Sequence, residues 1–208
     1  MKIVFFDTET TGLEPGGNEI IQLAAIATSG WPNFEELEDF EVKLQPSAQG
    51  KKDLRSLVNE GFASVYNEDV WHAECVAPKE GLMEFKGFLK DYADKEQKNK
   101  RGGTYRTAQG AAYNARFDVE FIMRSAAIHN CGFMPLDWRA LDVLQMALMI
   151  ELAAGKRFPN LKLETIAPMF GITLDKAHDA MHDVQATVDL ARRFASLANF
   201  PVRDGGDE

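Results

Sequence analysis

The residues of this sequence that are best suited to chemistry are acidic and fall in three short segments. The first segment is Asp7-Thr8-Glu9, which follows the apolar run from Ile3 to Phe6. Residues two apart on an extended chain point to the same side, so Asp7 and Glu9 would present two carboxylates together at a strand end. Such close like charges repel unless a cation compensates them, and carboxylate oxygens suit a hard divalent ion. The pair therefore indicates a metal site, with a solvated strand-to-turn junction as the alternative.

The second and third acidic segments lie at the predicted starts of helices. Asp118 falls in the first turn of a helix predicted over 117–129, where the helix dipole favours a carboxylate. Asp183 lies on a long helix predicted over 180–198, on the face that should pack against the sheet, so its charge needs a partner. The other residues of that face are Thr187, Leu190, Phe194 and Leu197. A charge that only supports its helix is the alternative for Asp118.

Two histidines and a further aspartate surround the start of this last helix. His178 lies near the loop-to-helix junction, where its ring could swing over a site formed by the acidic residues. His182 directly precedes Asp183, and adjacent helix positions point about 100° apart, so His182 should face elsewhere. Asp179 either continues the sheet-facing side of the helix or caps the helix start.

The elements that must position these residues alternate between strand and helix patterns, which predicts a three-layer α/β domain. The predicted strands cover 3–6, 20–27, 40–44 and 109–114. The predicted helices cover 78–92, 117–129, 141–153, 161–170 and 180–198. Residues 95–103 are predicted to be a polar break, and 45–78 show no clear pattern. We expect one domain over 1–200 and a polar, disordered tail over 201–208.

Composition limits the class of protein. The 208 residues are 45% hydrophobic and 26% charged, which is typical of a globular chain, and the formal net charge is −9. That charge argues against a nucleic-acid binder that uses its whole surface. Two cysteines are too few for a disulfide framework, and no stretch has the length of a signal-peptide core or a membrane span. We therefore expect a cytoplasmic protein without membrane contact.

The three segments, taken in order, resemble the motifs of the DEDDh, or DnaQ-like, family of 3′-to-5′ exonucleases. The matching segments are DTETTG with Asp7 and Glu9, YNARFD with Asn114 and Asp118, and His178 followed after four residues by Asp183. The resemblance spans about residues 1–198. Residues 161–172 are similar to a segment of the proofreading subunits of bacterial replicative polymerases, whereas residues 45–78 depart from the pattern of those subunits. It implies a ribonuclease H-like fold with a central mixed five-stranded sheet flanked by helices.

The resemblance also implies a catalytic site with two divalent metal ions, Mg²⁺ or Mn²⁺, and with His178 as general base. The implied metal ligands are Asp7, Glu9, Asp118 and Asp183. Two metals about 3.5 to 4 Å apart can activate a water and stabilise the leaving 3′ oxygen of a phosphodiester. An imidazole with an ordinary pKa of about 6.5 can accept the proton of that water near neutral pH.

A set of substrate-binding residues follows from the same resemblance. The terminal nucleotide is expected to lie against Thr8, Thr10, Gly12 and Leu13, with Leu13 wedged against the last base and Thr10 near the 3′ end. Asn114 is expected to contact the substrate or brace the site. A Thr/Gly turn and a turn-forming Asn would account for these residue types almost as well.

The function that these observations favour is metal-dependent release of nucleoside monophosphates from the 3′ ends of single-stranded DNA. The alternative is an exoribonuclease that acts on RNA ends or short oligoribonucleotides, and a catalytically silent module that binds nucleic acid or a polymerase is less favoured. The resemblance to proofreading subunits makes a DNA polymerase a candidate partner, and the oligomeric state stays open. Asp142, which resembles an acidic residue common in the family, is expected to have a structural role.

Three basic segments could contact nucleic-acid phosphates in this acidic chain. They are 95–106, which carries five basic residues against one acidic residue, the pair Lys156-Arg157, and the pair Arg192-Arg193. A solvated charged surface is an equal alternative for each of them.

Overall fold

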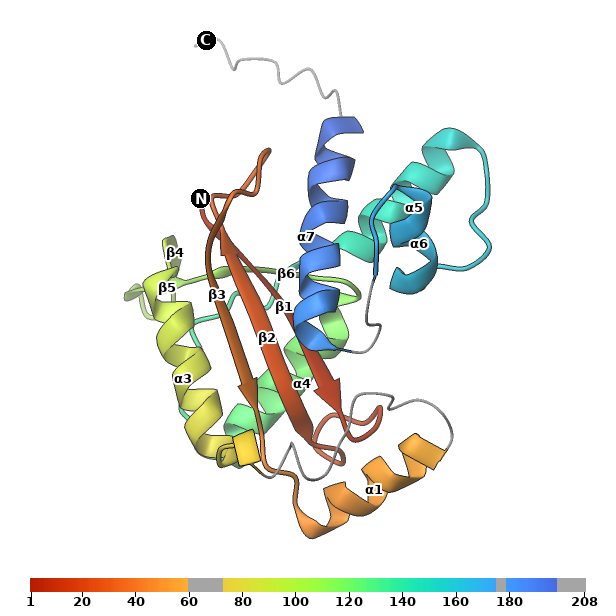
Figure 1. Cartoon of the computed structure of the whole chain (residues 1–208). Coiled ribbons are helices and arrows are strands. Elements are labelled where there is room, and N and C mark those ends of the chain that lie inside the picture. The colour runs from red at the N-terminus through yellow and green to blue at the C-terminus, as the bar shows by residue number, and fades with distance from the viewer. Residues whose placement is uncertain (60–72, 175–178, 198–208) are drawn as a thin grey trace.

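The centre of the protein is a mixed five-stranded sheet in the order β3-β2-β1-β6-β7 (Figure 1). The computed structural model describes residues 1–59, 73–174 and 179–197. Strand β1 pairs antiparallel with β2 and parallel with β6, while β3 and β7 form the edges. The strands of this sheet are β1 (Ile3–Thr10), β2 (Ile20–Thr28), β3 (Glu36–Lys43), β6 (Gln109–Ala112) and β7 (Leu141–Asp142).

Helices cover both faces of the sheet, which confirms the three-layer α/β fold. Helices α3 and α4 pack on one face, and α5, α6 and α7 pack on the other (Figure 1). The described helices are α1 (Ala48–Asn59), α3 (Pro78–Asp91), α4 (Ala115–Ile128), α5 (Val143–Ala154), α6 (Leu163–Met169) and α7 (Ala180–Leu197). Among them, none has the length and apolar character of a membrane span.

The apolar run at the start of β1 explains why this strand is central. Successive side chains of a strand point to opposite faces, so Val4 and Phe6 enter the core with α3 and α4. Ile3 and Phe5 enter the second core with α5, α6 and α7. All four side chains are buried. A strand packed on both faces is held firmly, and its carboxyl end carries Asp7 and Glu9.

The structure differs from the sequence-based predictions in four details. Residues 95–103, predicted as a break, contain β4 (Lys95–Lys98), which pairs with β5 (Thr104–Thr107) in a separate hairpin. The helix predicted over 141–153 begins only at Val143, because Leu141 and Asp142 form the strand β7, and α1 was not predicted. Leu197, predicted on the sheet-facing side of the last helix, is exposed because the buried side of α7 ends near Ala195.

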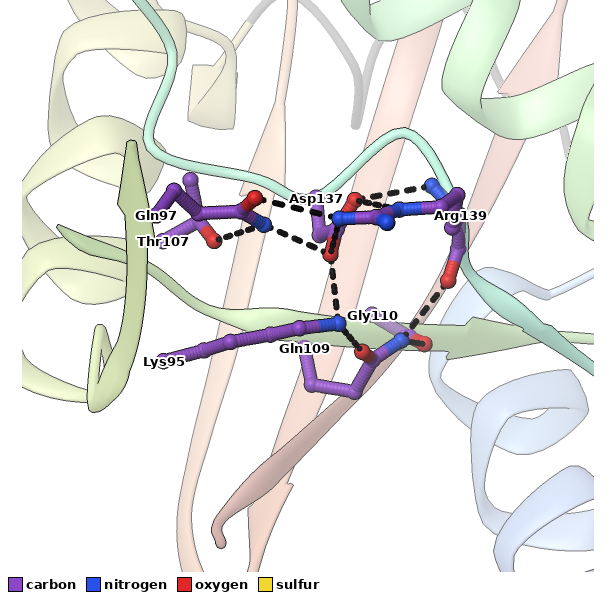
Figure 2. A network of polar contacts seen from close by, with 7 residues as sticks. All are labelled: Lys95, Gln97, Thr107, Gln109, Gly110, Asp137 and Arg139. Carbon is purple, nitrogen blue, oxygen red and sulfur yellow. Dashed lines mark hydrogen bonds and ion pairs between the residues drawn. The ribbon is translucent and has the colours of Figure 1, made fainter. Parts of the chain in front are cut away.

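A buried aspartate explains why the polar segment at 95–98 forms a strand (Figure 2). The Asp137 carboxylate is buried and accepts from Lys95 Nζ at 2.5 Å, Gln97 Nε2 at 2.8 Å and Arg139 Nε at 3.1 Å. Lys95 Nζ also donates to Gln109 Oε1 at 2.5 Å. The network therefore ties β4 to the start of β6.

The network also determines the charge state of its aspartate. Burial alone would raise the pKa of Asp137, but the hydrogen bonds and charges of Lys95 and Arg139 outweigh it and lower the pKa to about 2. Asp137 is thus ionised at neutral pH and pairs with Lys95 of the hairpin and with Arg139. Lys95, one of the basic residues considered for phosphate binding, is engaged in this ion pair.

Removal of the Asp137 carboxylate should loosen the hairpin. We expect Asp137→Ala to lower the free energy of unfolding by about 2 to 3 kcal/mol. The substitution leaves the donor groups of Lys95, Gln97 and Arg139 without their buried acceptor. Glu120→Ala is the matched control, since Glu120 forms an ion pair with the exposed Arg116 and such pairs contribute about 0 to 1 kcal/mol. Urea unfolding curves of both variants measure the difference, and equal losses would contradict this role of Asp137.

Candidate active site

The carboxyl end of β1 places two carboxylates at one end of the central strand of the sheet. Asp7 lies opposite Ala24 of β2, and Glu9 lies opposite Gln22, two residues further along. The two side chains share one face of the strand and are half-buried. The predicted pairing of these two carboxylates is therefore present in the structure.

Asp183 joins this pair from the opposite end of the sequence. It lies in the first turn of α7, which packs on β1 and β2. Carboxylate oxygens of Asp7, Glu9 and Asp183 all lie within 4.8 Å of one another. The helix start favours a negative charge at Asp183, but the closeness of three carboxylates opposes it.

Asp118 reaches the same strand from the other helical layer. It lies in the first turn of α4, is 2% exposed, and accepts hydrogen bonds from Thr8 N at 2.9 Å and Thr8 Oγ1 at 2.7 Å. Thr8 lies between Asp7 and Glu9 and points to the opposite face of β1. Asp118 is therefore held by Thr8, the residue between Asp7 and Glu9.

Burial and mutual repulsion raise the pKa values of these acids. Burial, followed by the charges of Asp118, Glu9 and Asp183, raises the pKa of Asp7 well above its ordinary value. Burial, followed by the charges of Asp183 and Asp118, raises the pKa of Glu9 from 4.5 to about 7. Burial raises the pKa of Asp118 to about 7, although the Thr8 hydrogen bonds oppose this rise. The carboxylates bind protons unless another cation takes their place.

The donor set fits divalent ions. Among the described residues, no lysine or arginine forms an ion pair with Asp7, Glu9 or Asp118. Converging carboxylate oxygens with raised pKa values are the hard, negatively charged ligands that Mg²⁺ and Mn²⁺ prefer. Asp7, Glu9 and Asp183 would hold such an ion most directly, and Asp118 lies beside them.

His178 lies outside the described residues, so its role as general base stays a prediction. The next residue, Asp179, accepts from the His182 backbone N at 3.4 Å and contacts His182 Nδ1 at 3.0 Å. Asp179 therefore caps the start of α7, one of the two roles considered for it. His182 is occupied by this contact, in agreement with the expectation that it does not face the carboxylates.

The turn after β1 is built by its own residues. Thr10 Oγ1 donates to the Gly12 carbonyl at 2.6 Å, and a Cβ on Gly12 would lie 2.5 Å from Asn18 Oδ1. Both residues thus serve the turn, while Leu13 is 82% exposed at the rim of the cleft. Their contacts with a substrate, like those of Thr8, stay predictions.

Asn114 connects the cleft to the edge of the sheet. Its φ of 65° is left-handed, a conformation that Asn tolerates better than most residues, and its side chain does not cap α4. Its backbone N donates to Asp142 Oδ1 at 3.0 Å, and the same oxygen accepts from Leu144 N at 3.0 Å. Asp142 therefore has the expected structural role, and Asn114 is both a turn residue and part of the cleft lining.

The carboxylates open into a cleft of about 660 Å³, and the sequence analysis did not identify part of its wall. Tyr113 donates from its hydroxyl to the Leu161 carbonyl at 2.8 Å, which fixes the segment before α6 against β6. The further wall residues are Phe117, Leu144, Leu161, Lys162 and Leu163. The sequence signal that could have indicated this wall is Leu161-Lys162-Leu163, in which a lysine stands between two apolar residues.

Comparison with known proteins points to nucleases. Residues 4–54 match the model of a family described as exonuclease, RNase_T. A DNA polymerase III of PolC type from Staphylococcus aureus is 28% identical over 184 residues, which cover 88% of this chain and 11% of the polymerase. The chain thus spans about a tenth of the length of that curated relative.

Solved structures support the fold. Exonuclease I of E. coli in complex with a dT13 oligonucleotide superposes with a TM-score of 0.66 at 20% identity, over 92% of this chain and 40% of that one. Exonuclease I of Methylocaldum szegediense superposes with a TM-score of 0.67 at 19% identity, over 94% of this chain and 40% of that one. The predicted ribonuclease H-like fold is therefore confirmed.

Loss of the Thr8 hydroxyl should weaken metal binding. Thr8→Val keeps the shape of the side chain and the backbone hydrogen bond but removes one of two donors to Asp118. We expect roughly tenfold weaker Mn²⁺ affinity, because partners that orient a metal ligand typically contribute about 10- to 100-fold. Thr8→Ser keeps the donor and should bind as the wild type does. Titration calorimetry measures both, and equal affinities of Thr8→Val and wild type would exclude this role.

Stability without metal should fall as the pH rises. The folded protein holds protons on Glu9 and Asp118 up to about pH 7, whereas the unfolded chain releases them near pH 4 to 5, so the free energy of unfolding decreases across this window. Mg²⁺ should therefore raise the melting temperature more at about pH 8 than at about pH 5. Thermal melts with Mg²⁺ or chelator test this, and Glu9→Gln should reduce both effects.

Proposed function

We propose that this chain, which is related to the DnaQ-like exonuclease domains, is a metal-dependent exonuclease that removes nucleotides from the 3′ ends of single-stranded DNA. The observation that carries this proposal is the convergence of Asp7, Glu9 and Asp183 within 4.8 Å at the base of a cleft. Carboxylates in this arrangement cannot all ionise without cations, and a phosphodiester cannot approach them without cations either.

The residues of the site have separable roles in phosphodiester hydrolysis. When bound, two divalent ions supply an activated water and neutralise charge on the phosphate and the leaving oxygen. Asp7, Glu9 and Asp183 would bind these ions and fix their position. Thr8 holds Asp118 in position through two hydrogen bonds. His178 is the proposed acceptor of the proton of the attacking water.

The cleft lining suits the last nucleotides of a single strand. Apolar side chains of the cleft lining, among them Leu13, Phe117 and Leu163, offer surfaces for unpaired bases. Of the relatives, one is a DNA polymerase and another is an exonuclease I bound to a DNA oligonucleotide. Both support DNA over RNA as the substrate of this chain.

The direct test uses a 5′-labelled DNA oligonucleotide with Mg²⁺, Mn²⁺ or chelator. We expect a ladder of products that shortens from the 3′ end with either metal and is absent with chelator. A single internal cut would indicate an endonuclease. An RNA oligonucleotide of the same sequence forms the second arm, and faster trimming of RNA would reverse the substrate preference.

Asp183→Asn tests the site within this assay. We expect at least about 100-fold slower trimming, because even residues that only orient metal ligands contribute about 10- to 100-fold. Asp189→Asn on the same helix is the matched control, since Asp189 pairs with Arg192 outside the cleft. Circular dichroism confirms that both variants fold. Trimming by Asp183→Asn at the rate of the control would place the site elsewhere.

A further inference from the structure

The connection between α5 and α6 is the basic segment that lies closest to the carboxylates. Residues 155–162, here called the basic loop, contain Lys156, Arg157 and Lys162 and no acidic residue. The loop leaves the end of α5 and returns to the cleft at Leu161. Lys162 therefore places one positive charge at a cleft whose other charged residues are carboxylates, and Lys156 and Arg157 lie further along the same loop.

Lys162 is the contact between the basic loop and the cleft. It lines the cleft together with Asp183 and Asn114, and its side chain is 69% exposed. Its ion pair with Glu164, at 3.2 Å, is also exposed, and such pairs are weak. A phosphate group in the cleft can therefore compete with Glu164 for this ammonium group.

Lys156 and Arg157 border a second hollow, on the outer side of α5. This hollow measures about 690 Å³ and is lined by Leu148, Met149 and Leu152, and also by Glu151, whose carboxylate accepts from the Phe158 backbone N at 3.0 Å. Met149 is 66% exposed and Leu152 is 75% exposed, while the opposite side of α5 is buried against α7. Neither Lys156 nor Arg157 forms an ion pair with any other residue in the described part of the chain.

The other basic segments are less available for a ligand. Lys95 is paired with buried Asp137, and the rest of its hairpin lies on the opposite side of the molecule from the basic loop (Figure 1). Arg192 is held by Asp189, Glu36 and the Phe34 carbonyl. Of the three basic segments, the loop after α5 alone combines unpaired cations with a residue that lines the cleft, within the described residues.

We infer that the basic loop and the exposed side of α5 form a track for the single strand that leads away from the cleaved end. Lys162, Lys156 and Arg157 contact successive phosphates, and the bases pack on Met149 and Leu152. Cations beside an apolar surface are the combination that binds single strands irrespective of sequence. The inference rests on the proposed function, because it extends the same substrate beyond the cleft.

The dimensions of α5 set the length of strand that the track accommodates. Leu144 at the cleft and Ala154 at the far end are separated by ten helical residues, about 15 Å at 1.5 Å per residue. Stacked nucleotides advance about 3.4 Å each along a strand, so the track accommodates roughly four to five nucleotides. A dinucleotide would therefore occupy the cleft without reaching Lys156 and Arg157.

The test is the double substitution Lys156→Ala/Arg157→Ala, compared with Lys98→Ala/Lys100→Ala on the β4–β5 hairpin. For a DNA 20-mer we expect the loop variant to raise KM roughly tenfold at low salt, with kcat unchanged, and to lower the salt slope of binding by about 1.4, or 0.7 per lost phosphate contact. Cleavage of a dinucleotide should be unchanged. The hairpin variant removes equal charge and should behave as the wild type does.

A second variant separates the apolar part of the track from the charges. Met149→Ala/Leu152→Ala should weaken binding of the 20-mer while leaving the salt slope unchanged, because no phosphate contact is lost. Equal losses on the dinucleotide and the 20-mer, or equal losses in the loop and hairpin variants, would overturn the track. Unchanged 20-mer binding by the loop variant would overturn it too, and would leave the cations for an acidic protein partner.

Binding is also measured without cleavage, by fluorescence anisotropy of a labelled 20-mer with Ca²⁺ in place of Mg²⁺. A loop variant that binds more weakly in this assay supports the track even if no nuclease activity is found. Activity that is present in wild type and in the loop variant, with the same KM for the 20-mer, rejects the track and retains the proposed function. The two proposals therefore fail in distinguishable ways.

Discussion

The repulsion among carboxylates at the end of β1 is the constraint on which the rest of this structure depends. Asp7, Glu9 and Asp183 bring their oxygens within 4.8 Å of one another, and buried Asp118 adds to their charge. Folding thus creates a site that stabilises protons or metal ions and penalises the bare anions. A chain that gathered these groups for stability alone would have paired them with lysine or arginine, as it does at Asp137.

The fold opposes this repulsion by packing β1 on both of its faces. The buried side chains of β1 alternate between two cores, so displacement of the strand would disturb both helical layers. Each layer also contributes one carboxylate, Asp118 from α4 and Asp183 from α7. Thr8 links the two layers. Its backbone N and its hydroxyl hold Asp118, while Asp7 and Glu9 on either side of it face the layer of α7. The geometry of the site is therefore a consequence of packing on both faces of one strand.

The sequence predicts the parts of this arrangement that depend on local periodicity. The pairing of Asp7 with Glu9 follows from the two-residue repeat of a strand, and the apolar runs predict the central strands and the long helices. The convergence with Asp118 and Asp183 required the family resemblance, since spacing alone does not bring distant segments together. The roles of His178 and of the substrate-binding residues stay predictions.

Other features could not be predicted because their causes are tertiary. The segment Lys95–Lys98 has no apolar residue to indicate a strand, and it is ordered by Asp137, some forty residues away. The hydrogen bonds of Thr8 to Asp118 join residues 110 positions apart. In both cases the role of a polar residue depends on a buried partner that is distant in the sequence. The local sequence pattern does not identify that partner.

The distribution of charge matters more here than the net value of −9. Four negative charges belong to the site, and two divalent ions would neutralise them, which leaves about −5 spread over the surface. Remaining acidity repels a polyanion except where cations are locally in excess. In the basic loop Lys162 lines the cleft and Lys156 and Arg157 lie further along, so a strand would be attracted at one edge and repelled elsewhere. An acidic surface thereby favours a single route of approach over indiscriminate binding along a basic face.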